Sequence, residues 1–282
     1  MRKADDILDL IAEFKARGTP FAVATVVRTV AATAAKAGAK AIITPEGRVA
    51  GGWIGGGCAR AAVLAAAREA LADGKPRLVS IQPKDLLDAK GLRSGEVREG
   101  VAFAKNMCPS RGTMDVFVEP LLPRASVVVL GASPVAVAIA DLARRIGFAV
   151  TAAAPLDELD AFGDLDGHID GYGIPARSEG ERFLVVATQG RGDLAALKAA
   201  LSTDSDYVAF VGSRAKAASL REQLVEEGLE AARIDRLRAP AGLDLGAIGP
   251  EEIALSVVAE IVEVRRRGQH APARAVRVAG PS

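Results

Sequence analysis

The spacing of apolar and polar residues changes along the chain near Pro123. Before this proline, short apolar runs rich in β-branched residues are separated by turns that contain Gly and Pro. After it, short apolar runs alternate with segments whose apolar residues recur every three or four positions, which is the period of a helix lying on a core. We therefore expect two domains, over residues 1–123 and 124–267. Residues 268–282, rich in Pro, Arg and Gly, are expected to be a disordered tail.

The same pattern predicts the individual elements. In the first domain we predict helices over 4–17 and from Cys58 to about Ala72, strands over 21–28, 41–43, 49–50, 78–81 and 116–122, and a polar, irregular segment over 83–113. In the second domain we predict strands over 127–130, 148–152, 183–187 and 207–211 and helices over 134–146, 193–201, 214–227 and 250–267. Strands that alternate with helices indicate a doubly wound parallel sheet. The predicted class is α/β, with an N-terminal α/β domain followed by a Rossmann-like domain.

The composition narrows the classes of partner. Half of the 282 residues are apolar and a quarter are charged, and the formal net charge is +1, so nothing indicates a nucleic-acid partner. No apolar run approaches the ~20 residues that span a bilayer, and the N-terminus lacks a signal-peptide core. We expect a cytoplasmic protein with no membrane span, in which Cys58 and Cys108 are reduced thiols.

A glycine loop marks the first strand-to-helix turn of the second domain. Gly131, Ala132 and Ser133 follow a strand and open a helix, as in the dinucleotide pattern G-x-G-x-x-G, but the second glycine is replaced by Ser133 and the third by Ala136. The helix N-terminus still offers N–H groups and a dipole to an anion, and the hydroxyl of Ser133 offers a further donor.

The next strand argues against a nicotinamide cofactor. Enzymes that bind NAD place an acid at its end to hold the ribose hydroxyl, but this strand ends in Ala153 and Ala154. NAD and NADP are therefore disfavoured. Three alternatives stay open at this point: a different pyrophosphate-bearing ligand, which we favour, a Rossmann fold whose site is empty, and ordinary NAD or NADP binding.

Both cysteines lie near glycines. Cys58 follows Gly55, Gly56 and Gly57 and opens a helix, a position that lowers the pKa of a thiol and favours thiolate. Cys108 lies between Met107 and Met114, and thiolate with thioether is a ligand set that prefers Cu(I). The alternative is that Cys58 and Met114 only fill core space. The two histidines are isolated in the sequence, which excludes an evident zinc site or Ser-His-Asp triad.

Several motifs resemble those of the XdhC/CoxI family. Residues 240–261 (PAGLDLGAIGPEEIALSVVAEI) resemble the family stretch P-I-G-L-D-x-G-x-x-x-P-x-E-I-A-x-S-I-x-A-E-I, and 211–216 (VGSRAK) resemble its G-S-R-x-K turn. Gly55 to Cys58 is similar to S-G-G-C, and 108–120 to C-G-G-x-M-x-V-F-x-E-P. The chain departs from the family at Ala59-Arg60, where Glu is common, at Thr188-Gln189, where Thr-His is common, and after Cys108. These departures resemble the CoxF-type branch, accessory to carbon-monoxide dehydrogenase.

The resemblance implies a maturation factor rather than an enzyme. Such a protein would bind the molybdenum cofactor, with a molybdopterin cytosine dinucleotide as the expected form and copper as a further candidate, and would assist its sulfuration, metal loading or insertion into an apo xanthine- or carbon-monoxide-dehydrogenase. The expected cofactor contacts are Gly55, Gly56, Gly57, Cys58, Cys108, Gly131, Ala132, Ser133, Gly212, Ser213 and Arg214, with Cys58 and Cys108 as metal ligands. A homodimer remains open, as do two rival functions: a Rossmann oxidoreductase, and a docking protein without a small-molecule ligand.

Overall fold

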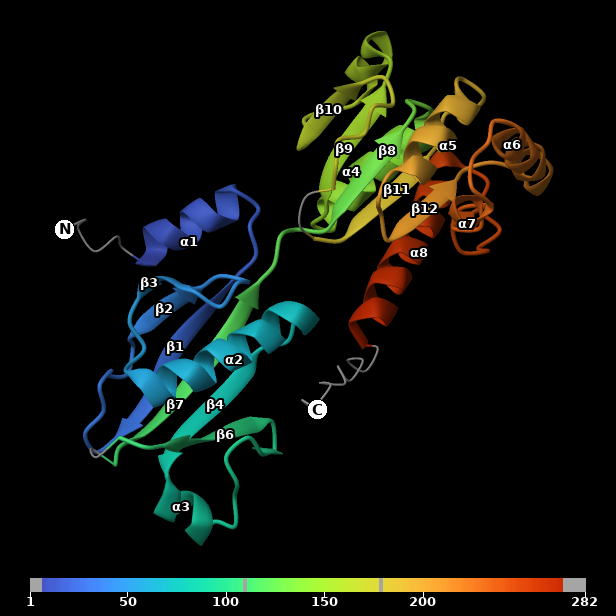
Figure 1. Cartoon of the computed structure of the whole chain (residues 1–282). Helices are drawn as coiled ribbons and strands as arrows, with labels where there is room; N and C mark the ends of the chain where they lie inside the picture. Colours follow the sequence, from blue (N-terminus) through green and yellow to red (C-terminus); the bar gives the residue numbers. More distant parts are fainter. Residues whose placement is uncertain (1–6, 109–110, 178–179, 271–282) are drawn as a thin grey trace. The chain divides into compact units, whose positions relative to one another are not determined.

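The computed structural model describes residues 7–108, 111–177 and 180–270 (Figure 1). They form two compact units that divide between Pro123 and Arg124. Each unit has its own β-sheet and its own hydrophobic core, as expected of separately packed domains.

The first unit is built on a seven-stranded mixed sheet with the strand order β3-β2-β1-β7-β4-β6-β5. β4 and β6 pair in parallel, whereas the other neighbours pair antiparallel. It follows that β1, β3, β4 and β6 all end on the same side of the sheet, where β7 begins. The strands are β1 (Phe21–Val30), β2 (Lys40–Ile43), β3 (Val49–Gly52), β4 (Arg77–Pro83), β5 (Val97–Arg98), β6 (Val101–Asn106) and β7 (Thr113–Leu121).

Helices cover the two faces of this sheet unequally. The alanine-rich α2 (Gly57–Asp73) packs on β1, β4 and β7 through small buried residues such as Ala66, Ala67 and Ala70. On the opposite face, α1 (Ile7–Ala16) lies over β2 and β3, and the Phe14 and Phe21 rings are 5.3 Å apart. The apolar periods of both segments therefore predicted the helices correctly.

The prediction of an irregular segment over 83–113 was wrong. This segment contains the short helix α3 (Lys84–Ala89) and strands β5 and β6. The parallel ladder between β6 and β4 stabilises β6, which has a mixed sequence, and a short antiparallel pairing adds β5 at the sheet edge. Sequence periodicity does not register such partners, because they lie far away along the chain.

The second unit contains a six-stranded parallel sheet with the order β10-β9-β8-β11-β12-β13. Numbered within the unit, this is the order 3-2-1-4-5-6 of dinucleotide-binding sheets, so the predicted Rossmann-like class is confirmed. The strands are β8 (Ser126–Leu130), β9 (Ala149–Ala154), β10 (Gly167–Asp170), β11 (Arg182–Val186), β12 (Tyr207–Phe210) and β13 (Leu237–Arg238).

Helices pack on both faces of this sheet, as a doubly wound fold requires. One core joins the sheet to α4 (Pro134–Arg145), the 3-10 turn η1 (Leu156–Ala161) and α8 (Pro250–His270). The opposite core joins it to α5 (Asp193–Ser202), α6 (Arg214–Glu226) and α7 (Ala231–Ile234). Figure 1 shows α8 running alongside α4, in agreement with their extensive contact.

The predicted disordered tail, residues 268–282, is only partly described by the structure. Helix α8 continues to His270, so the first residues of the predicted tail, 268–270, are helical. The rest of that tail, 271–282, lies outside the described residues. Within the ranges that the structure describes, no helix combines the length and the apolar character that crossing a bilayer requires.

Candidate functional site

The carboxyl ends of the parallel strands in the second unit form the first candidate site. β8 and β11 are neighbours whose connections leave in opposite directions. Sheets with this order bind ligands in a crevice between the loops that follow such a pair, which is called the β8–β11 crevice below. Gly131 lies in the loop after β8 with φ +103°, and a Cβ on it would lie only 2.6 Å from Thr188 Cα and 2.8 Å from the Ala187 carbonyl oxygen. Glycine is therefore required here both by conformation and by the close approach of β11.

The hydroxyl of Ser133 serves the fold rather than an incoming anion. It donates a hydrogen bond to the Ala187 carbonyl at 2.6 Å and accepts one from the Ala136 N–H at 3.2 Å, which caps α4. The expectation that this hydroxyl offers a spare donor was wrong, because its proton is already committed to β11. The Gly131 N–H is committed as well, because it donates to the Ala153 carbonyl at 2.9 Å. What remains for an anion is the positive end of α4.

The end of β9 has no acidic residue, which is the feature that disfavours a nicotinamide cofactor. The strand ends in the buried alanines Ala153 and Ala154. Glu158 follows in η1, and its carboxylate is 3.2 Å from the Arg191 guanidinium. This acid already has a partner in the loop after β11.

The turn after β12 places Gly212, Ser213 and Arg214 at the start of α6. A Cβ on Gly212 would lie 2.4 Å from the Phe210 ring, so packing explains this glycine. Ser213 caps the helix by accepting the Lys216 N–H at 3.2 Å, and Arg214 is exposed in the first turn. In strand order β11 lies between β8 and β12, so the loop after β11 separates the two turns that we expected to bind phosphate.

That intervening loop carries a polar cluster that sequence reasoning missed. Asp193, the first residue of α5, accepts hydrogen bonds from the Thr188 hydroxyl and from the Gly190 N–H (3.0 Å), and it is ion-paired with the Lys216 ammonium. Burial raises the pKa of Asp193, but the bonds from Lys216, Thr188 and Gly190 outweigh it and hold the pKa below its usual range. Thr188, Gly190, Asp193 and Lys216 are called the β11-loop cluster below.

Two neighbours extend the β11-loop cluster. The Tyr172 hydroxyl, from the segment after β10, donates to the Arg191 carbonyl at 3.0 Å. Burial, with the nearby carboxylates of Glu158 and Asp193, raises the pKa of Tyr172. Gln189, exposed in the same loop, adopts φ +51°, which is uncommon for a residue other than glycine. The one sequence signal for the β11-loop cluster was Thr188-Gln189, where the family often has Thr-His. The hydrogen bond of Thr188 to Asp193 could be seen only in the fold.

In the first unit, the loops after β1, β3 and β6 meet near the start of β7. Ala32 forms an isolated bridge with Arg111, and a Cβ on Gly112 would lie 2.2 Å from the Ala32 carbonyl oxygen. A Cβ on Gly55 would lie 3.6 Å from the Met114 methyl carbon. The fold therefore brings the loop that leads to Cys58 and the loop that follows Cys108 to the same side of the sheet.

Cys58 lies in the first turn of α2, as predicted, with Gly56 as N-cap. Gly56 and Gly57 are exposed, and a Cβ on either would meet no atom within 4 Å, so packing in this chain does not explain these glycines. The side chain of Cys58 is outside the described part of the structure. The proposal that both sulfurs hold one metal is therefore untested. Among the described residues, no group of three or more His, Cys, Asp and Glu side chains is placed to hold a metal ion.

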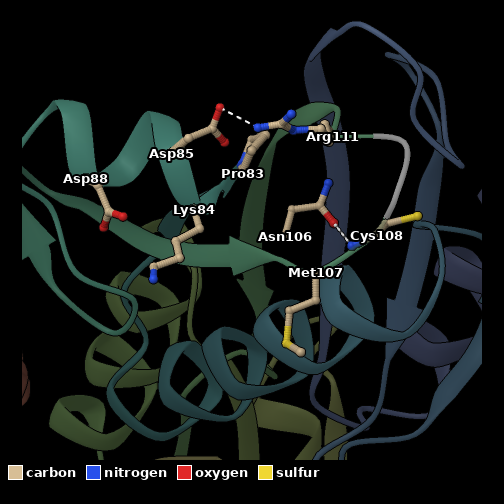
Figure 2. Close-up of a pocket in the computed structure, with 8 residues that line it drawn as sticks. All are labelled: Pro83, Lys84, Asp85, Asp88, Asn106, Met107, Cys108 and Arg111. Carbon is tan, nitrogen blue, oxygen red and sulfur yellow. Dashed lines mark hydrogen bonds and ion pairs between the residues drawn. The ribbon is translucent and has the colours of Figure 1, made fainter.

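Cys108 lines an open depression of about 350 Å³ beside β4, α3 and β6 (Figure 2). Its backbone N–H donates to Asn106 Oδ1 at 2.9 Å, and Arg111 pairs with Asp85 across the depression at 2.8 Å. Figure 2 shows the exposed thiol of Cys108 and the thioether of Met107 pointing in different directions. Met114 is buried in the core under α2, so packing explains it.

Comparison with known proteins gives consistent matches in both units. A model described as the XdhC and CoxI family matches residues 14–82, and one described as the XdhC Rossmann domain matches residues 127–261. The uncharacterized protein YqeB of Escherichia coli is 29% identical over 90% of this chain and 45% of its own length. A Bacillus subtilis protein described as a probable xanthine dehydrogenase subunit is 30% identical over 55% of this chain and 47% of its own length.

A crystal structure described as a xanthine dehydrogenase from Bacillus halodurans is similar over 92% of this chain and 96% of that chain, at 18% identity and a TM-score of 0.45. The chain spans less than half the length of the two curated relatives. The two family models together match more than half of the chain and fall in separate units. The chain belongs to the XdhC/CoxI family.

Proposed function

We propose that this chain is an accessory protein in the maturation of a xanthine- or carbon-monoxide-dehydrogenase-type enzyme. It binds the molybdenum cofactor, as a pterin dinucleotide, and assists its sulfuration, metal loading or insertion. The cofactor is cargo here, received from one protein and passed to another. Family membership supports the client class, because one relative is itself described as a probable xanthine dehydrogenase subunit.

The observation that carries the ligand class is the glycine loop at the β8–β11 crevice. Gly131 allows the tight turn that brings the start of α4 close to Thr188, and the positive end of α4 lies at the strand ends where sheets of this order bind ligands. A pyrophosphate fits these features. The alanines at the end of β9 offer no carboxylate to a nicotinamide ribose, which favours a dinucleotide of another kind.

The loops around Cys58 and Cys108 are the proposed place for sulfur or soft-metal chemistry. The thiol of Cys108 is exposed at the depression, and a thiolate is the form of cysteine that attacks sulfur or binds a metal. Copper is a candidate cargo on the same grounds, since thiolates prefer Cu(I).

The test is to express the chain in a molybdenum-replete host and identify the small molecule that copurifies by mass spectrometry and absorbance. A pterin dinucleotide at near-stoichiometric occupancy is the expected result. A copurifying nicotinamide nucleotide would instead support a Rossmann oxidoreductase. A protein that binds the apo-dehydrogenase but never carries a small molecule would be a docking protein.

A further inference from the structure

We infer that Lys216 is a ligand-binding cation of the second unit and that Asp193 is its internal competitor, the anion that a phosphate group of the ligand displaces. This inference rests on the proposed pyrophosphate site and extends it from the glycine loops to the β11-loop cluster. The ligand class is a pyrophosphate or phosphate ester.

The position of Lys216 supports a role at the crevice. Its ammonium lies between two loops at the carboxyl ends of the strands, 3.8 Å from where a Cβ on Gly190 would be and 5.7 Å from the centre of the Phe210 ring. Loops at this end of a doubly wound sheet are where such folds bind ligands. The Ser213 cap fixes the Lys216 backbone in the first turn of α6, beside the positive end of that helix.

Asp193 and Lys216 differ in how easily each side chain can leave their ion pair. The Asp193 side chain is only 8% exposed, and Thr188, Gly190 and Lys216 all donate to it. The Lys216 side chain is 40% exposed, and an ammonium has three N–H donors. Lys216 is therefore the partner that can turn to a second anion, whereas Asp193 keeps two hydrogen bonds without it.

The same geometry explains why the lysine is paired when no ligand is bound. Asp193 holds the long side chain in one place, which lowers the entropy lost when a phosphate is bound. The carboxylate also repels that phosphate, so it lowers the affinity at the same time. An Asn at position 193 loses the repelling charge, but its amide oxygen can still accept a hydrogen bond from Lys216. Removing the charge of Lys216 and removing that of Asp193 should therefore change phosphate binding in opposite directions.

The experiment uses the full chain and calorimetric titration with inorganic pyrophosphate. Lys216→Gln should weaken binding about tenfold, Lys216→Arg should largely retain it, and Asp193→Asn should tighten it about threefold. Lys198→Gln is the matched control, because Lys198 forms a comparable pair with Glu227 (2.7 Å) away from the strand ends. Its affinity should equal that of the unaltered protein. Thermal unfolding of each variant reports whether it is folded.

The outcomes separate this inference from the proposed function. If the unaltered protein does not bind pyrophosphate, the phosphate site itself is wrong. If it binds and Lys216→Gln binds equally well, the site stands and the role of Lys216 is refuted. If both Lys216→Gln and Asp193→Asn weaken binding, Asp193 supports the loop and is no competitor. Should Asp193→Asn fail to fold, Lys216→Gln and Lys216→Arg still test the role of Lys216. Weaker binding by the first with retained binding by the second supports it, and equal binding by both refutes it.

Discussion

At the scale of single residues, Gly131 can be separated from an ordinary turn glycine. Gly147, at the end of α4, has a similar φ of +95°, but a Cβ on it would meet nothing within 4 Å. Alanine at either position adopts an unfavourable backbone conformation, which costs about 1 kcal/mol. Only Gly131→Ala also drives a Cβ against the β11 backbone. We expect Gly131→Ala to destabilise the protein by about 2–4 kcal/mol and Gly147→Ala by about 1, measured by denaturant unfolding.

The two glycines also differ in their expected effect on the ligand. A methyl group on Gly131 would collide with the Thr188 backbone and displace the turn that positions the α4 N-terminus, so pyrophosphate affinity should fall in that variant and stay unchanged in Gly147→Ala. Equal affinity in both variants would place the ligand elsewhere in the unit.

The cysteines give a second prediction at the residue scale. Cys108→Ser changes an exposed side chain and should leave stability within about 0.5 kcal/mol. We expect Cys58→Ser and Cys108→Ser each to yield a folded protein that no longer matures its client, because serine lacks the soft sulfur. The measurement is the activity of a coexpressed dehydrogenase. Full activity with the double variant would mean that neither thiol takes part.

At the scale of elements, a buried carboxylate ties the 239–249 segment to α8. Glu260 accepts the Tyr207 hydroxyl (2.7 Å), the Gly242 N–H (2.8 Å) and Arg238 (3.1 Å). Burial, with the hydrogen bond to Glu260, raises the pKa of Tyr207, so its hydroxyl stays a donor. This contact joins the end of the family motif to its beginning.

Glu260→Gln should therefore weaken the second unit. The amide directs an N–H₂ group toward donors that need an acceptor, which should cost about 1–3 kcal/mol in the free energy of unfolding. Glu263→Gln, on the same helix, removes only a surface pair with Arg267 and should cost less than about 0.5 kcal/mol. Similar denaturation midpoints for the two variants would show that the buried network contributes little.

The elements recovered from sequence are those whose own periodicity is strong. The apolar run of β8, which is buried on both faces, and the one-sided apolar patterns of α4 and α8 predicted these elements to within three residues at each end. β10, β13 and α7 were not predicted, because they are two to four residues long and depend on neighbours in the fold. The same limit applies to β6, whose partner β4 is a separate run of the chain.

The candidate site also contains some residues with a local sequence signal and others that only the fold brings together. The places of Gly131, Gly55 and Cys58 before or at the start of a helix were predicted correctly, because glycines before a helix carry a local signal. The β11-loop cluster was missed because Thr188, Asp193 and Lys216 become one site only when α5 and α6 pack side by side. The Ser133 hydroxyl was misjudged for a related reason, since its acceptor, the Ala187 carbonyl, is 54 residues away.

At the scale of the second unit, the Rossmann topology and the residues at the strand ends lead to different expectations about a nicotinamide cofactor. The strand order is that of NAD-binding sheets, so the fold alone would predict a dehydrogenase. Two local features argue otherwise: the alanines at the end of β9, and Ser133 and Ala136 in place of glycines. Function in this fold is therefore decided by a few positions at the strand ends.

The intact chain should accordingly bind NAD and NADP weakly. Without a carboxylate at Ala153 or Ala154, the ribose hydroxyls lose a charged partner, and Glu158 is already paired with Arg191. A lost charge-assisted hydrogen bond is worth about 1.5–3 kcal/mol, or roughly 10- to 150-fold in affinity. We expect calorimetric titration to show dissociation constants well above those for a pterin or cytosine dinucleotide under the same conditions. Tight, stoichiometric NAD binding by the unaltered protein would contradict this reading and restore the oxidoreductase function.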